Sequence, residues 1–371
     1  MTIRQKGMTL VEILVAVAIG MIGIVIITQA YLTSDNFNRS TLGESGAQTN
    51  GLIGLYTIER DVRNAGYGIA DSAALGCGEM YWYFDPAYSS NVQPGSTLPK
   101  ILLAPIVIGT DTTAPFTDPD SITVMFATGD NRMLPGTIKG FVPKSSEVEL
   151  DQTAGFKDND LVVLVNGTGC TLAQVTHIQP GPIKLQINPG ISAPYNPPAW
   201  GLFPTNYGTG DLIINLGNPV VRTYFVADGR LKVFDARFQN PLAAEINLMD
   251  GIVDLRAQYG KDNGVNNGTV SAASYTPNDA RVDQFSNVTP ANSAEWQQVL
   301  TVRVGILARI GSYERPTAPG GNCEATTTQP RWSGGTFDAV DIATLASPDR
   351  CYRYRVFETT IPLRNMVWRA T

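Results

Sequence analysis

Gly7, Met8 and Glu12 are the residues whose types and spacing most suggest chemistry in this sequence. If the chain is cut after Gly7, Met8 becomes the new N-terminus and carries an ammonium group. Glu12 is the natural partner of that ammonium, either in the same chain or in a neighbouring one. A carboxylate inside a bilayer costs about 2–3 kcal/mol at the centre of a helix and less near an end, so such a group usually needs a charged partner.

Catalytic chemistry is not indicated by the rest of the sequence. The chain has one histidine, His177, in an alternating stretch where a side chain on the surface of a strand is the simpler interpretation. Neither a Gly-x-Ser-x-Gly motif nor a phosphate-binding loop occurs. We therefore expect that the protein is not an enzyme.

Calcium is the one cofactor that the sequence leaves open. This ion prefers six to eight oxygen ligands, often including several carboxylates. Two acidic loops are candidates, but a solvated turn is the favoured interpretation of each, so no cofactor is expected. Their residues are Asp111, Asp118 and Asp120 in the first loop and Asp262, Asn263, Asn266 and Asn267 in the second.

Four cysteines occur without a Cys-x-x-Cys pair, so the spacing typical of zinc sites is absent. An even number of cysteines in an exported domain predicts two disulfides. We favour the pairs Cys77–Cys170 and Cys323–Cys351, although four cysteines allow three pairings. Four free buried thiols are the alternative.

Residues 8–32 form the element that must position Met8 and Glu12. The segment is mostly apolar, and its 25 residues exceed the roughly 20 that a membrane-spanning helix needs. Arg4 and Lys6 precede it, which predicts a cytoplasmic N-terminus and places the rest of the chain outside the cytoplasm.

The formal net charge of −6 argues against a generally basic surface for nucleic acid.

Residues 33–68 are predicted to continue this helix beyond the membrane. The segment 34–65 contains no proline, and its apolar residues recur near helical spacing, so one face needs a partner. Gly43, Gly46, Gly51 and Gly54 each cost up to about 1 kcal/mol relative to alanine in a helix. A kink, close packing or partial melting at 43–54 therefore remains open.

Gly7-Met8-Thr9-Leu10-Val11-Glu12 resembles the class III signal of type IV prepilins. The resemblance implies that residues 1–7 are a leader, that a prepilin peptidase cleaves between Gly7 and Met8, and that Met8 is then N-methylated. It also implies that Glu12 takes part in assembly. The family commonly has phenylalanine where this chain has Met8. A secretory signal peptide or a plain membrane anchor is the alternative.

The end of the predicted helix and several later segments are similar to the PilW family of minor pilins. The residues that carry this similarity are Asp61 to Tyr67, Asp160 to Val165 followed by Cys170, Asp250 to Gly260, Val302 to Arg309 and Tyr354 to Asn365. The similarity implies a component of the type IV pilus that partners major and other minor pilins and the inner-membrane assembly platform. Priming or tip assembly, twitching motility, adhesion and DNA uptake are the implied roles.

Residues 69–371 are predicted to form one large strand-rich domain, so the fold class is α+β with a long N-terminal helix. Short apolar runs lie between turns rich in Gly, Pro, Asn and Asp, and Asp228-Gly229 indicates a hairpin. The aromatic stretch 80–84 is interpreted as packing, with a ligand-binding patch as the alternative. The expected location is the inner membrane, with a periplasmic domain, and later the extracellular pilus.

Two other functions remain open at this point. One is a minor pseudopilin of type II secretion, closest to the J class, which shares the anchor and a β domain. The other is an adhesin, at a pilus tip or anchored in the membrane, that binds carbohydrate through its aromatic segments. Direct binding of nucleic acid is not expected.

Overall fold

The computed structural model describes residues 9–69, 75–84, 101–109, 119–128, 135–142, 146–167, 169–179, 183–198, 206–235, 245–264, 279–316, 318 and 320–367. Its first element is helix α1, Leu10–Asn64, which is continuous over 55 residues. The helix begins at a capping box and ends where Gly66 adopts a φ of 80°, a conformation that favours glycine. The glycines at 43–54 therefore produce no break.

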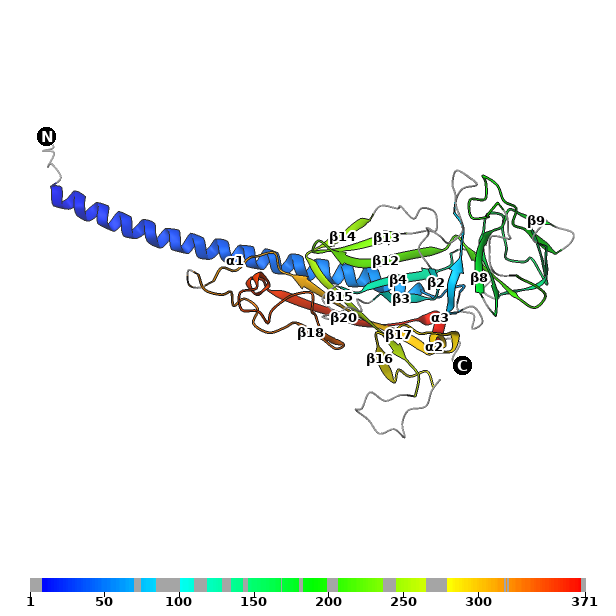
Figure 1. Ribbon diagram of the computed structural model, residues 1–371. Helices are drawn as coiled ribbons and strands as arrows, with labels where there is room; N and C mark the ends of the chain where they lie inside the picture. The colour runs from blue at the N-terminus through cyan, green and yellow to red at the C-terminus, as the bar shows by residue number, and fades with distance from the viewer. Residues whose placement is uncertain are drawn as a thin grey trace.

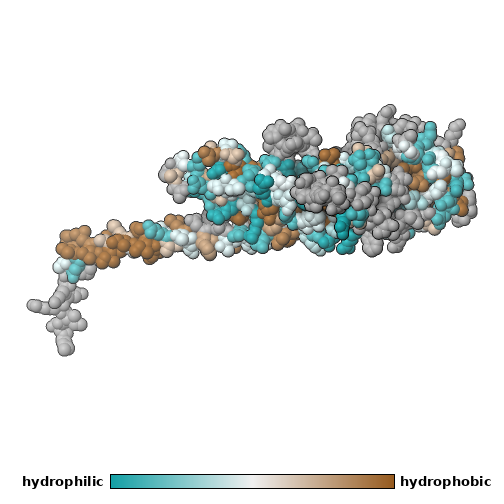
Figure 2. Space-filling model, turned by 90° about the horizontal axis from the view of Figure 1, so that it is seen from below, coloured by the Kyte–Doolittle hydropathy of each residue, from teal (hydrophilic) through white to brown (hydrophobic). Residues whose placement is uncertain are grey.

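The two halves of α1 have different surroundings. The first half leaves the body of the protein as a free rod, and its surface is apolar (Figures 1 and 2). Leu10–Asp35 is long and apolar enough to cross a membrane, and none of its most apolar window is buried. In the second half Leu55, Ile58 and Val62 are buried in the main core. One helix thus joins an uncovered segment to a packed one.

A four-stranded antiparallel sheet packs against one side of the buried half of α1. Its strand order is β16-β15-β17-β20, with β15 at Ile252–Lys261, β16 at Gln284–Ser286, β17 at Val299–Arg309 and β20 at Tyr354–Pro362. Alternate residues of β17, among them Val302, Val304 and Ile306, lie in the same core as Ile58. The ring of Phe357 occupies the space where Gly51 lacks a side chain. Glycine therefore permits close packing here.

A five-stranded sheet lies on the other side of α1, so the helix runs between two sheets (Figure 1). Gly54 lies close to both, because a Cβ there would be 3.1 Å from Leu231 and 3.9 Å from Ile306. The hairpin predicted at Asp228-Gly229 joins two of the strands. The order is β14-β13-β12-β4-β3, with β3 at Ile106–Gly109, β4 at Ser121–Phe126, β12 at Val220–Ala227, β13 at Arg230–Asp235 and β14 at Ile246–Asp250.

A second body of strands, which we call the distal lobe (residues 135–217), lies at the end of the molecule far from the N-terminus (Figure 1). It contains β5 at Gly136–Val142, β6 at Glu147–Leu150, β7 at Leu161–Asn166, β8 at Gly169–Gln174, β9 at His177–Gln179, β10 at Lys184–Gln186 and β11 at Leu212–Gly217. With β1, Cys77–Tyr81, and β2, Ile101–Leu103, they form a sheet of order β2-β1-β8-β7-β11-β5-β6-β10-β9. The apolar run of β7 is buried on both faces.

The last part of the chain covers the outer face of the four-stranded sheet. Trp332 and Phe337 pack there on Leu307 in a small separate core. The segment contains β18, Arg331–Trp332, β19, Gly335–Thr336, and the 3₁₀ helix η3, Pro348–Cys351. The last helix, α3, Arg364–Val367, follows β20 and contributes Met366 to the main core. A short helix α2, Ser293–Gln297, is capped by Asn292, whose side chain accepts from the Glu295 amide.

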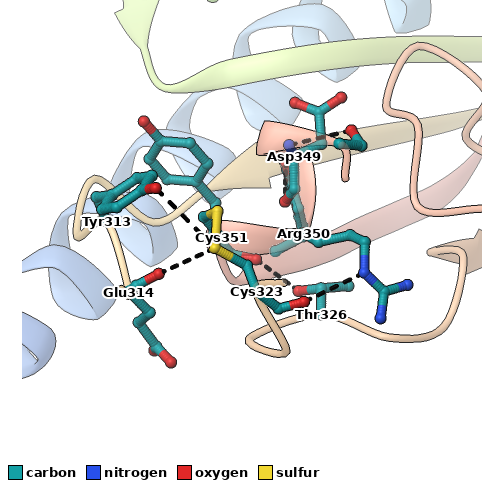
Figure 3. Close-up of a disulfide and its surroundings, with 10 residues drawn as sticks. Tyr313, Glu314, Cys323, Thr326, Asp349, Arg350 and Cys351 are labelled. Atoms are coloured by element: carbon teal, nitrogen blue, oxygen red, sulfur yellow. Dashed lines mark hydrogen bonds between the residues drawn. A yellow bond between two sulfur atoms is a disulfide. The ribbon is translucent and has the colours of Figure 1, made fainter. Parts of the chain in front are cut away.

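Two disulfides join the described cysteines in the pairs favoured from the sequence. Cys77–Cys170 links β1 to β8, and Cys323–Cys351 closes the covering segment at η3 (Figure 3). Arg350 reinforces the second link, because its Nε donates to the Cys323 carbonyl at 3.2 Å and its Nη1 to the Ile342 carbonyl at 2.8 Å. The first disulfide thus holds β1 to the distal lobe, and the second closes the segment that covers the four-stranded sheet.

Candidate functional site

The N-terminal end of α1 is the candidate site that the sequence emphasises. Thr9 caps the helix, and its hydroxyl accepts from the Glu12 amide at 3.3 Å. Glu12 Oε2 in turn accepts from the Thr9 amide at 2.9 Å and from its hydroxyl at 3.1 Å. Gly7 and Met8 lie outside the described residues. Glu12 is therefore held in the first turn of α1, where it is exposed and makes no contact with the domain.

The apolar surface that follows Glu12 has no covering within the described protein. Thirteen large apolar side chains between Leu10 and Ile27 are at least 48% exposed. A patch of this extent on a protein marks contact with a membrane or with other chains. The chemistry of this end of the molecule is therefore insertion and helix packing, with a single carboxylate near the start of the apolar surface.

Asp61 fixes α1 to the five-stranded sheet, and the sequence did not reveal this role. Its carboxylate is 2% exposed and accepts from Tyr224 Oη at 2.6 Å and from Arg222 Nη1 at 2.9 Å. Asp235 also holds Arg222, at 3.2 Å. A signal was available, because Asp61 falls between the apolar positions 58, 62 and 65, on the face that had to be buried.

The segment after Asp61 continues this attachment. The Gly66 amide donates to the Met125 carbonyl at 2.9 Å, and the Ala127 amide donates to the Tyr67 carbonyl at 2.8 Å. The buried carboxylate of Asp61 and these backbone bonds show that residues 61–67 attach α1 to the domain. At the opposite end of the packed half, Arg355 pairs with Glu44 at 2.8 Å. The packed second half of α1 is thus attached to the domain at both of its ends.

The residues considered for catalysis or calcium have other partners. His177 lies on β9 with its side chain 57% exposed, 3.7 Å from Asp158. Asp120 accepts from the Ala257 amide at 2.8 Å, and Asp262 from the Ala280 amide at 2.7 Å. Asp111, Asp118, Asn266 and Asn267 lie outside the described residues. Among the residues that are described, no cluster of three acidic, histidine or cysteine side chains is arranged to hold a metal ion.

Asp120 belongs to a buried charge cluster with Arg256 and Asp254. Arg256 Nε lies 3.0 Å from Asp254, and its Nη1 lies 3.9 Å from Asp120. Burial raises the pKa of each carboxyl to about 6, against the opposing effects of Arg256 and of backbone hydrogen bonds. The cluster is therefore a pH-sensitive part of the packing between the sheet and the segment that covers it.

The aromatic stretch 80–84 packs in the interior. Met80, Trp82 and Tyr83 are each at most 3% exposed and belong to the two cores on either side of β7. The interpretation as packing is confirmed for these residues.

This protein has an exposed apolar helix with Glu12 in its first turn, and the same helix continues into a half that packs on a strand-rich domain. That is the organisation of a type IV pilin. The prokaryotic N-terminal methylation motif matches residues 3–28. The family described as type IV pilus-assembly protein W matches residues 223–365, which include the four-stranded sheet around α1. Over these residues the chain is similar to the PilW family of type IV pilus minor pilins, which are structural proteins.

Comparisons with individual proteins add little to this assignment. Among solved structures, a type IV-like pilin from Thermus thermophilus is 10% identical, with a TM-score of 0.29 over 85% of this chain and 95% of that one. A similarity of this size carries no argument. No curated protein matches the chain.

Proposed function

We propose that this minor pilin works in the priming or tip complex of the type IV pilus. The supporting observation is the continuity of α1, which joins an uncovered apolar half to a half packed between two sheets. Before assembly the first half lies in the inner membrane, with the N-terminus cytoplasmic and the domain periplasmic. On assembly the same apolar surface exchanges lipid for the helices of neighbouring pilins, and the domain is carried into the extracellular pilus.

Processing and division of the chain follow from this proposal. Residues 1–7 are a leader that a prepilin peptidase removes between Gly7 and Met8, and Met8 is methylated. Residues 8–32 form the membrane and filament-core segment, 33–68 its amphipathic continuation, and 69–371 the domain that gives the subunit its identity. Major pilins, other minor pilins and the inner-membrane assembly platform are its partners, and twitching motility, adhesion or DNA uptake are downstream consequences.

Glu12 has the central part in this mechanism. Its capping bonds from Thr9 satisfy the helix end within one chain, and the carboxylate retains its charge for a second interaction. An ammonium at Met8 of an adjacent pilin would offset that charge in a low-dielectric environment, where an unpaired carboxylate is costly. Because only one position along the helix offers this pairing, the pair also sets the axial register.

Two measurements test this proposal. Co-expression with a prepilin peptidase, followed by mass spectrometry of the mature N-terminus, should give N-methylated Met8; retention of residues 1–7 or cleavage after Ala30 would contradict it. Glu12→Gln keeps an acceptor for the capping box and removes the charge, so membrane insertion should persist while piliation falls. Thr28→Ala is the matched control, because the Thr28 hydroxyl bonds the Ile24 carbonyl within α1. Normal piliation in Glu12→Gln would refute the charge pairing.

A further inference from the structure

One face of the packed half of α1 remains uncovered among the described residues. Its large apolar side chains are each at least 44% exposed, and they are Leu42, Leu52, Ile53 and Tyr56. The smaller residues between them, at 45, 46 and 49, are exposed as well. We call this set, residues 42, 45, 46, 49, 52, 53 and 56, the open seam. Single apolar side chains scattered on a surface need no explanation, whereas four on one side of one helix indicate a contact.

The spacing of the open seam is that of a surface on which a second helix packs. Leu42, Thr49 and Tyr56 are separated by one heptad each, and Ser45 and Leu52 fall three residues after the first and the second of them. Positions related in this way form a narrow stripe along a helix, which is the stripe that meets another helix in a coiled coil. The partner that fits the seam is therefore helical.

Gly46 lies in the open seam, and packing within the chain does not account for it. A Cβ at Gly43 would be 3.1 Å from Ile310, and one at Gly51 would overlap the ring of Phe357, so these two glycines make room for the domain. A Cβ at Gly46 would have no atom within 4 Å. Glycine destabilises a helix relative to alanine, and small residues allow two helix backbones to approach closely. Gly46 therefore indicates the close approach of a helix from outside the chain.

The chemistry and position of the open seam restrict its partner to an apolar helix outside the bilayer. Glu44 is the one charged residue in the sequence from 41 to 56, and it is turned to the domain, where it pairs with Arg355 at 2.8 Å. The segment that is long and apolar enough to cross a membrane ends at Asp35. Leu52 lies about 25 Å further along the helix at 1.5 Å per residue, so lipid tails do not reach it.

We infer that the apolar first half of a neighbouring pilin's α1 packs along the open seam and approaches most closely at Gly46. This inference rests on the proposed function, in which that half exchanges lipid for the helices of other pilins. The seam continues the uncovered apolar surface of the first half, because both lie on one unbroken helix (Figure 1). In this chain the first half has no domain around it, whereas the second half is flanked by two sheets. A helix of the first kind therefore fits along the seam without bringing a second domain against the first.

Photo-crosslinking of the full chain in its native cells tests the contact. A benzophenone-bearing residue replaces Thr49, at the centre of the open seam, and mass spectrometry identifies the peptide that becomes joined to it on irradiation. We expect a peptide from the apolar N-terminal helix of another pilin. The same probe in place of Ile191, which is 74% exposed in the distal lobe, should give no such peptide. An adduct with lipid or with the strand-rich domain of a pilin, or the absence of any adduct, would overturn the inference.

Gly46→Leu gives an independent readout. Within the subunit the new side chain enters open space, so membrane insertion and the melting temperature should not fall. The amount of the subunit in sheared pili, relative to the membrane, should fall about tenfold, because the larger side chain overpacks the contact between helices. Gly167→Leu, at an equally open glycine of the distal lobe, is the matched control and should leave this ratio unchanged.

Equal ratios in the two variants would overturn the inference. The proposed function fails in a different way. If the unaltered chain is absent from pili while the probe at position 49 still captures the apolar helix of another pilin, the contact stands and only the role in the pilus is wrong.

Discussion

Replacing Asp61 by alanine should loosen the attachment of α1 to the domain. The change removes the acceptor of the buried Tyr224 hydroxyl and one of the two carboxylates that hold Arg222. Breaking a buried ion pair from one side costs about 3–5 kcal/mol. Arg222 is 24% exposed and keeps Asp235, which places the expected loss near the lower end, at about 3 kcal/mol.

Urea unfolding of the full chain in mild detergent, followed by tryptophan fluorescence, measures this loss. Trp296 is 1% exposed in the same core and reports its opening. Tyr224→Phe removes one hydrogen bond to a charged acceptor and should cost about 1.5–3 kcal/mol. Glu59→Ala is the control, because its pair with Arg63 lies on the surface of α1 and is worth about 0.5 kcal/mol or less.

The relative free energies of unfolding of these variants test the structural role of Asp61. If Asp61→Ala unfolds within about 0.5 kcal/mol of Glu59→Ala, the buried contact contributes no more than a surface ion pair, and the structural role assigned to residues 61–67 is wrong. A loss of helix packing should also expose the second half of α1 to proteases, which gives an independent readout.

Three further predictions concern packing, charge and the covering segment. Gly51→Ala should destabilise the fold by about 1–3 kcal/mol, because its Cβ would overlap the ring of Phe357. Gly46→Ala should instead stabilise the helix by up to about 1 kcal/mol, because a Cβ there would have no atom within 4 Å. Equal melting temperatures of the two variants would contradict the close packing at Gly51. The raised pKa of Asp254, about 6, means that the folded state binds a proton more readily than the unfolded one, so the free energy of unfolding should increase as the pH falls from 7.5 to 5, and Asp254→Asn should flatten that slope. Replacing both Cys323 and Cys351 by serine opens a loop with a sequence separation of 28 and should lower the free energy of unfolding by about 3.5 kcal/mol. The measurement is a lower melting temperature. An unchanged melting temperature would show that the covering segment is held by its core alone.

The anchor could be predicted from the sequence because its cause is local. An apolar run of this length specifies a helix that is long enough to cross a membrane, and Thr9 and Glu12 specify its first turn. The glycines of α1 could not be interpreted in the same way. The cost of Gly51 lies within the helix, but its benefit depends on Phe357, which is more than 300 residues away in the chain, so close packing could not be separated from a kink.

The same limitation applies to polar residues. Asp120 reads in sequence as one acid of a loop, and only the pairing of distant strands places it beside Arg256. Hairpins follow from neighbouring residues and the number of disulfides follows from counting, whereas a buried charge cluster requires the complete topology.

The way in which the distal lobe is connected has a mechanical consequence. The chain enters the lobe after Phe126 and leaves it before Val220, and these two residues face each other across β4 and β12. Cys77–Cys170 adds a third covalent connection, from β8 to the strand that follows α1. Tension applied to the lobe would therefore be shared among three covalent connections. The subunit can bear load along its axis without relying on the strength of the sheet contacts alone.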